Sequence, residues 1–140
     1  MGNQTDVEKA LSTRFASLGY TYVSWPSGPK ITPPADAINY SIMVLYGETV
    51  AAAVGANAAK RVLGIYQVTI RVPETGSGTY AALAAAEAVA AAFPRGTAIP
   101  WPVAAPTTYA HVKDPTITHF GNITEEWYTV VVRIPFYSDV

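Results

Sequence analysis

The residues best suited to metal chemistry are the two histidines, His111 and His119, which flank Asp114. Imidazole and carboxylate groups are common ligands of zinc and manganese, so this segment could support a metal-dependent hydrolase. The spacing of the two histidines matches no metal motif of the HExxH kind, and no paired carboxylates or Ser/His/Asp arrangement surround them. We therefore predict no enzyme, no catalytic residue, no metal and no cofactor, and keep the metal-dependent enzyme as the alternative from another functional class.

A glycine-rich turn of sequence GSG occupies residues 76–78, between a predicted strand and a predicted helix. Phosphate-binding loops occur at the same place, because a helix N-terminus offers free backbone N–H groups. The segment lacks the lysine of a P-loop and the third glycine of the dinucleotide pattern. A tight chain reversal accounts for these glycines, and no nucleotide site is predicted.

Composition points to an assembled protein. Of the 140 residues, 50% are hydrophobic and only 14% are charged, against about a quarter in an average soluble domain. An isolated chain of this kind has few charges with which to cover its surface, so part of that surface is expected to be buried by other subunits. The formal net charge is −1, with lysines and arginines scattered singly, which disfavours tight nucleic-acid binding.

Length and cysteine content set further bounds. The size fits a single domain over 1–140, and the absence of cysteine excludes disulfides and thiolate metal sites. The opening MGNQTDVEK lacks the pattern of a secretory signal, and no apolar run approaches the about 20 residues that span a bilayer. Cytosolic synthesis is expected.

Hydrophobic periodicity predicts an α+β fold, a single mainly antiparallel sheet with two helices packed on one face. Residues 66–72 alternate between apolar and polar, as expected for a strand with one covered face. Helical spacing follows the GSG turn as far as Phe93, and Gly64 is predicted to mark a bulge or a close approach within the preceding strand. The predicted helices are 5–18 and 79–93, and the predicted strands are 20–25, 40–46, 61–72, 109–112, 116–120 and 127–137.

Three segments are predicted as flexible loops, near 26–38, 47–60 and 94–108. The first and third are rich in proline, and the second is an alanine-rich stretch interrupted by Gly55 and Asn57, which could also be the tip of a long hairpin. Gly121 and Asn122 are predicted to form the turn between the last two strands.

Several segments, taken in order, resemble the phage tail terminator-like family. Residues 64–93, GIYQVTIRVPETGSGTYAALAAAEAVAAAF, look like its strand of the form YQVxVxVP, followed by a glycine-containing turn and a helix ending in Phe. The closing WYTVVVRIPFYSDV resembles its last strand, and VEKALSTRFASL, VSWP and YSIMVLYGE match its order. The resemblance spans nearly the whole chain.

The resemblance implies a structural protein of the virion that forms a ring, expected to be a hexamer, on the end of the phage tail tube. Such a ring stops polymerisation of the tube protein and presents the surface that joins the head and neck. The implied partners are other copies of the chain, the tail tube protein and a head–tail connector protein. DNA would pass through the lumen without specific binding, and the protein would be made in the host cytoplasm and end in the virion.

Contacts with the tube or with neighbouring subunits are expected on the loops 47–59 and 97–108, because long loops beside a rigid sheet can become ordered on a partner. The candidate interface residues are Val50, Val54, Asn57, Trp101 and Tyr109. A core role for Trp101 or Tyr109 is left open at this point. Two further functions also stay open: another neck or tail-completion protein, such as a head-closure or minor tail component, and a binding adaptor of unknown ligand.

Overall fold

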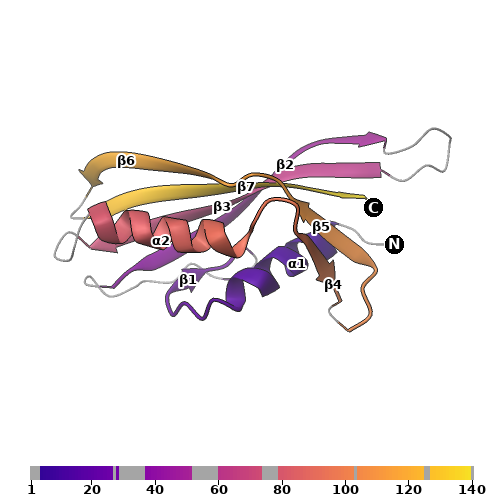
Figure 1. The fold of residues 1–140 in the computed structure, drawn as a ribbon, viewed down its shortest axis with the longest axis horizontal. Coiled ribbons are helices and arrows are strands. Elements are labelled where there is room, and N and C mark those ends of the chain that lie inside the picture. The colour runs from indigo at the N-terminus through magenta and orange to yellow at the C-terminus, as the bar shows by residue number, and fades with distance from the viewer. Residues whose placement is uncertain are drawn as a thin grey trace.

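The computed structural model describes residues 4–26, 28, 37–51, 60–73, 79–102, 104–124 and 127–139, and gives only the backbone at 4, 48–51, 79 and 119–124. Two helices and a seven-stranded sheet form an elongated α+β molecule (Figure 1). The elements are α1 (Gln4–Ala16), β1 (Val23–Ser24), β2 (Asn39–Ala51), β3 (Lys60–Pro73), α2 (Thr79–Ala92), β4 (Ala98–Trp101), β5 (Thr108–Val112), β6 (Thr116–Thr124) and β7 (Trp127–Asp139).

The sheet is mixed, which corrects part of the predicted fold. Its strand order is β1-β2-β3-β7-β5-β4, with β6 also paired to β7. The long strands β2, β3 and β7 are antiparallel, as expected, but β1 pairs with β2 in parallel through Val23 and Ser24. The long connection between β1 and β2 makes this possible, because a parallel pair needs a crossover and cannot be closed by a tight turn.

One edge of β7 is shared by two strands. Residues Thr116 to Thr124 of β6 pair with the first half of β7, and His111 and Val112 of β5 pair with Tyr137 and Phe136 near its end. The chain between β5 and β6, around Pro115, interrupts this edge because proline has no backbone N–H to donate to a ladder. Beyond the interruption, β5 pairs with β7 on one side and with β4 on the other, and the sheet is curled there.

The core follows the alternation of the long strands. On β3 the even-numbered side chains from Tyr66 to Val72 are buried, and on β7 the same holds from Val130 to Phe136. Helix α2 contributes the stripe Ala82, Ala86 and Val89, which is fully buried, and its small alanines allow the helix to lie close to the strands. The buried side of the alternation was therefore predicted correctly.

The two helices cover different parts of the curled sheet, so the expectation of a single sheet with two helices packed on one face needs correction. Helix α2 packs along β3, β6 and β7, whereas α1 packs mainly against β4 and β5 (Figure 1). They meet around Tyr66, whose hydroxyl lies 3.1 Å from the hydroxyl of Ser12 on α1 and whose ring lies 6.0 Å from Phe93, just beyond α2.

Gly64 marks a close approach, as predicted. A Cβ at this position would lie 2.6 Å from Cζ of Phe136 and 2.9 Å from the carbonyl oxygen of Leu45. The ring of Phe136 covers this glycine and meets the ring of Tyr46 edge-on, with centroids 6.4 Å apart. Glycine is needed here because any side chain would displace the packed ring.

Predicted loop boundaries need three corrections. Strand β4 lies inside the predicted loop 94–108, since Ala98 to Trp101 pair with His111 to Thr108, and the peptide bond from Trp101 to Pro102 is cis. The predicted turn at 121–122 belongs to β6, in an irregular stretch between His119 and Ile123. Strand pairing also covers both ends of the predicted loop 47–60, and most of the predicted loop 26–38 lies outside the described residues.

Candidate interaction surface

The hairpin of β2 and β3 is longer than the sequence indicated. Its pairing continues to Ala51 opposite Lys60, past an irregularity between Tyr46 and Thr49. Val50 is therefore a strand residue, whose backbone pairs with Arg61, while Val54 and Asn57 lie outside the described residues. The long-hairpin interpretation of this segment is confirmed, and it extends the sheet towards one end of the molecule (Figure 1).

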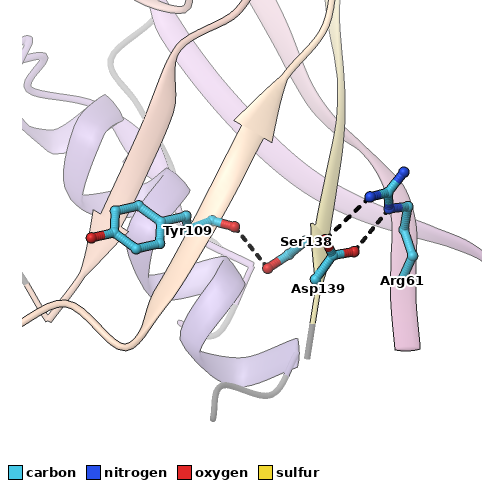
Figure 2. Close-up of polar contacts among 4 residues, drawn as sticks. All are labelled: Arg61, Tyr109, Ser138 and Asp139. Atoms are coloured by element: carbon cyan, nitrogen blue, oxygen red, sulfur yellow. Dashed lines mark hydrogen bonds and ion pairs between the residues drawn. The ribbon is translucent and has the colours of Figure 1, made fainter. Parts of the chain in front are cut away.

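The far end of the described part of this hairpin, where Val50 pairs with Arg61, is joined to the end of β7 by a bidentate ion pair. Nε of Arg61 lies 2.8 Å from Oδ1 of Asp139, and its terminal nitrogen donates to the other carboxylate oxygen at 3.2 Å (Figure 2). The hydrogen bonds lower the pKa of Asp139 and raise that of Arg61, since both favour the charged forms. Both side chains are about 40% exposed, so solvent screens the pair and its role is mainly to orient.

The aromatic ring of Tyr137 lies beside this ion pair. The guanidinium of Arg61 lies 4.5 Å from the centre of the Tyr137 ring, and the imidazole of His111 stacks on the same ring at 4.8 Å with an interplanar angle of 17°. Lys113 approaches the ring to 5.7 Å. Cations favour the faces of aromatic rings, so this row ties β3, β7 and β5 together and concentrates positive charge.

A buried hydroxyl joins the hairpin of β4 and β5 to the same end of β7. Ser138 is fully buried, and its Oγ donates a hydrogen bond of 2.8 Å to the backbone carbonyl of Tyr109 (Figure 2). The ring of Tyr109 is 45% exposed. Tyr109 is thus held by its backbone and presents its ring outward, which is the arrangement expected of an interface anchor.

Trp101 has a different environment. It lies opposite Thr108 at the end of β4, whereas Tyr109 lies opposite the preceding residue, Pro100. Because successive residues of a strand point to opposite faces, the side chains of Trp101 and Tyr109 lie on opposite faces of the hairpin. The Trp101 ring is half-buried, lies 6.0 Å from Nζ of Lys9 and, with Trp25, lines a groove of about 280 Å³ along α1. Trp101 therefore packs partly on the body of the protein.

His111 and Asp114, which the metal hypothesis required as ligands of one ion, have different partners in the structure. His111 stacks on Tyr137, and Asp114 forms an exposed ion pair with Arg95 at 3.4 Å. The backbone of His119 pairs with Val130, but its side chain is not among those described. In the part of the chain that the structure describes, no group of three or more metal-ligating side chains is found.

Sequence reasoning missed Arg61, Tyr137, Ser138 and Asp139. Arg61 and Asp139 are 78 residues apart, and only the register of β3 against β7 places them together. One signal was present: Arg61 near the start of β3 and Asp139 at the end of β7 carry opposite charges, which is favourable where strands pair antiparallel.

The comparisons with known proteins agree with this architecture. A family model described as phage tail terminator protein matches residues 6–136, which is almost the entire chain. The search among curated proteins gave no match. Among the described helices, none is both long and apolar enough to cross a membrane. With the match extending from Asp6 in α1 to Phe136 in β7, the chain belongs to the phage tail terminator family.

Proposed function

We propose that this structural component of the phage tail forms a ring on the end of the tail tube, terminates tube polymerisation and provides the surface that joins the head and neck. The family match supports the tail-associated role. The ring, which we propose to be a hexamer, would be built of copies of this chain, with the tail tube protein on one axial face and a connector protein on the other.

One observation carries the proposal: two segments singled out for partner contact converge on the same end of the molecule. Arg61 and Asp139 join the far end of the described β2–β3 hairpin to the end of β7, and Ser138 joins the β4–β5 hairpin to the same end of β7 (Figure 2). Exposed hairpins held on a rigid sheet present a defined surface to a partner. A repeating tube end is such a partner, because every subunit of a ring would meet the same contact.

The low charge of the chain fits the same assembly. Copies that close into a ring must each bury two side faces, and such faces are depleted in charged residues. With a net charge of −1, the chain also suits a conduit through which DNA passes without specific binding. Assembly would take place in the host cytoplasm, and the finished protein would reside in the virion.

Shortening the β2–β3 hairpin tests the assignment. Replacing residues 52–59 with an Asn-Gly turn joins Ala51 to Lys60, which already pair, and should leave the sheet intact. We expect a folded protein that no longer caps tubes, so that electron microscopy of tails shows overlong or variable tubes. Tail lengths identical to wild type would contradict the assignment.

Binding assays separate this function from that of another neck or tail-completion protein. The purified chain should retain the tail tube protein in a pull-down, and the shortened hairpin should abolish retention. Retention of a head connector with no binding of the tube protein would favour the neck protein instead. Ser17→Ala, which alters an exposed side chain just beyond the C-terminal end of α1, serves as the control for general damage.

A further inference from the structure

The face of the sheet that lies away from the buried core carries an apolar patch. Because side chains alternate along a strand, the odd-numbered residues of β2, β3 and β7 point away from the buried even-numbered ones. Met43 is 55% exposed and Leu45 is 43% exposed, and Leu45, Ile65 and Pro135 form one row across three strands. The members of this sheet patch are Met43, Leu45, Leu63, Ile65 and Pro135.

The outer face of α2 is also apolar. Tyr80 is 82% exposed and Leu83 is 38% exposed, and the exposed alanines Ala84, Ala88 and Ala91 continue the same side of the helix. Glu87 is the one charged residue of the helix. A helix that is apolar all round is a buried helix, and α2 buries only its inner stripe within its own chain.

The sheet patch and the outer face of α2 carry charges of opposite sign. Arg133 borders the sheet patch, and its Nε donates to the neutral Oε1 of Gln67 at 3.2 Å. Within the described residues, neither Arg133 nor Glu87 takes part in an ion pair. A carboxylate in the middle of an apolar helix face and a guanidinium beside an apolar sheet patch are complementary when one surface covers the other.

We propose that α2 of one copy packs on the sheet patch of the next copy, with Glu87 directed at Arg133 of its neighbour. The two surfaces lie on opposite sides of the chain, so the contact is head-to-tail and each copy can use both surfaces at once. A contact of this type closes into a ring when the rotation between copies allows it. Alanines let the helix approach a second sheet as closely as it approaches its own. The inference rests on the proposed ring and adds the pair of surfaces that builds it.

Cysteine cross-linking tests the contact directly, because the chain has no cysteine of its own. Met43→Cys places a thiol on the sheet patch and Ala84→Cys places one on the outer face of α2. We would treat the purified protein and isolated tails with a bismaleimide that spans about 10 Å, the separation of packed layers. The far-UV circular dichroism spectrum of each variant would first be compared with that of wild type, to check that the variant is folded.

The expected result is a covalent dimer when the two single variants are mixed, and a ladder that ends at the ring when both cysteines are in one chain. In the control, Thr5→Cys on α1 replaces Ala84→Cys, and no ladder should form. Cross-linking of Ala84→Cys to itself, or of Met43→Cys to the tube protein or DNA-facing components, would overturn the inference.

A charge exchange provides the second test. Glu87→Arg and Arg133→Glu should each raise the concentration needed for assembly about five- to tenfold, and the double variant should restore it. Arg95→Glu, in an exposed ion pair elsewhere, should have little effect. Single variants that assemble normally, or a double variant without recovery, would overturn the proposed pairing.

Native mass measurement of the wild-type protein, free and released from tails, distinguishes the two proposals. A ring without the predicted cross-links overturns this contact and leaves the proposed function standing. A protein that caps tubes without any ring overturns both the contact and the ring. Ring, ladder and charge rescue together support the inference.

Discussion

Arg61 and Asp139 occupy directly opposed positions of β3 and β7 and hold those strand ends together through two hydrogen bonds. The pair lies at the far end of the described β2–β3 hairpin, one position from its last paired residues, Ala51 and Lys60. It therefore holds this end of the hairpin against β7, although its exposure makes its contribution to global stability small.

The first prediction concerns pH. The pKa of Asp139 is lowered in the folded protein, so its contribution is present above the unfolded-state value near 3.8 and is lost as the pH falls through the folded-state value. Amide protection factors, which correct for the pH dependence of intrinsic exchange, should fall at the ends of β3 and β7 at that low pH, and Asp139→Asn should lower them in the same way at neutral pH. High salt should reproduce part of the effect. Exchange rates that do not respond to the substitution would contradict the role of the pair.

Replacing Gly64 tests the close approach. Gly64→Val forces a side chain against Phe136 and against the backbone of Leu45, and overpacking of this kind costs about 1–3 kcal/mol. Denaturant unfolding should show a lower midpoint. Gly47→Ala is the matched control, because the nearest atoms to its Cβ would lie at 3.7 Å, an ordinary contact. Equal stability of Gly64→Val and wild type would show that the strand shifts freely.

The contact between Tyr66 and Ser12 should appear as a measurable coupling. Tyr66→Phe removes a hydroxyl whose partner lies 3.1 Å away and should lower the free energy of unfolding by about 1 kcal/mol. Ser12→Ala should cost a similar amount, and the double variant should cost little more than either one. Fully additive losses would mean that the hydrogen bond contributes nothing.

Ser138→Ala should loosen the β4–β5 hairpin. The substitution leaves the carbonyl of Tyr109 without its buried donor, at a cost of about 1–3 kcal/mol. Hydrogen exchange should show faster opening of β4 and β5 than of β2 and β3, because only the former hairpin depends on this bond. Ser17→Ala, which removes an exposed hydroxyl after the end of α1, provides the control.

Substitutions of the two aromatic candidates, Tyr109 and Trp101, should affect stability and tube capping differently. Tyr109→Ala should change stability by less than about 0.5 kcal/mol, because its ring is exposed, yet impair tube capping. Trp101→Ala should lower stability, because the ring packs beside α1. Thermal unfolding and tail-length measurements on both variants check this. Normal capping by Tyr109→Ala would remove Tyr109 from the interface.

Features that depend only on residues close together in the sequence were predictable. Alternation identified the buried side of β3, and helical spacing as far as Phe93 identified the helix α2. Gly64 was singled out correctly because a glycine inside a strand usually marks a bulge or a place where another group comes close to the backbone. Each of these inferences needed only residues within one element.

What the sequence did not reveal depends on register between distant strands. Proline at positions 100 and 102 indicated a loop, yet pairing with β5 forms β4 there, because an edge strand tolerates residues without an N–H. Gly121 and Asn122 are residue types common in turns, but both lie within β6 in an irregular stretch. The contacts of Arg61 with Asp139 and of Ser138 with Tyr109 cannot be inferred before β7 is aligned with its neighbours.

The interruption around Pro115 has a mechanical consequence. Because β5 and β6 divide one edge of β7 between them, a force on the β4–β5 hairpin reaches the other strands through the last residues of β7. Helix α1 provides a second path, because it packs against β4 and β5 and its Ser12 contacts Tyr66 of β3. A partner that pulls on this hairpin would therefore load the last strand and the first helix together.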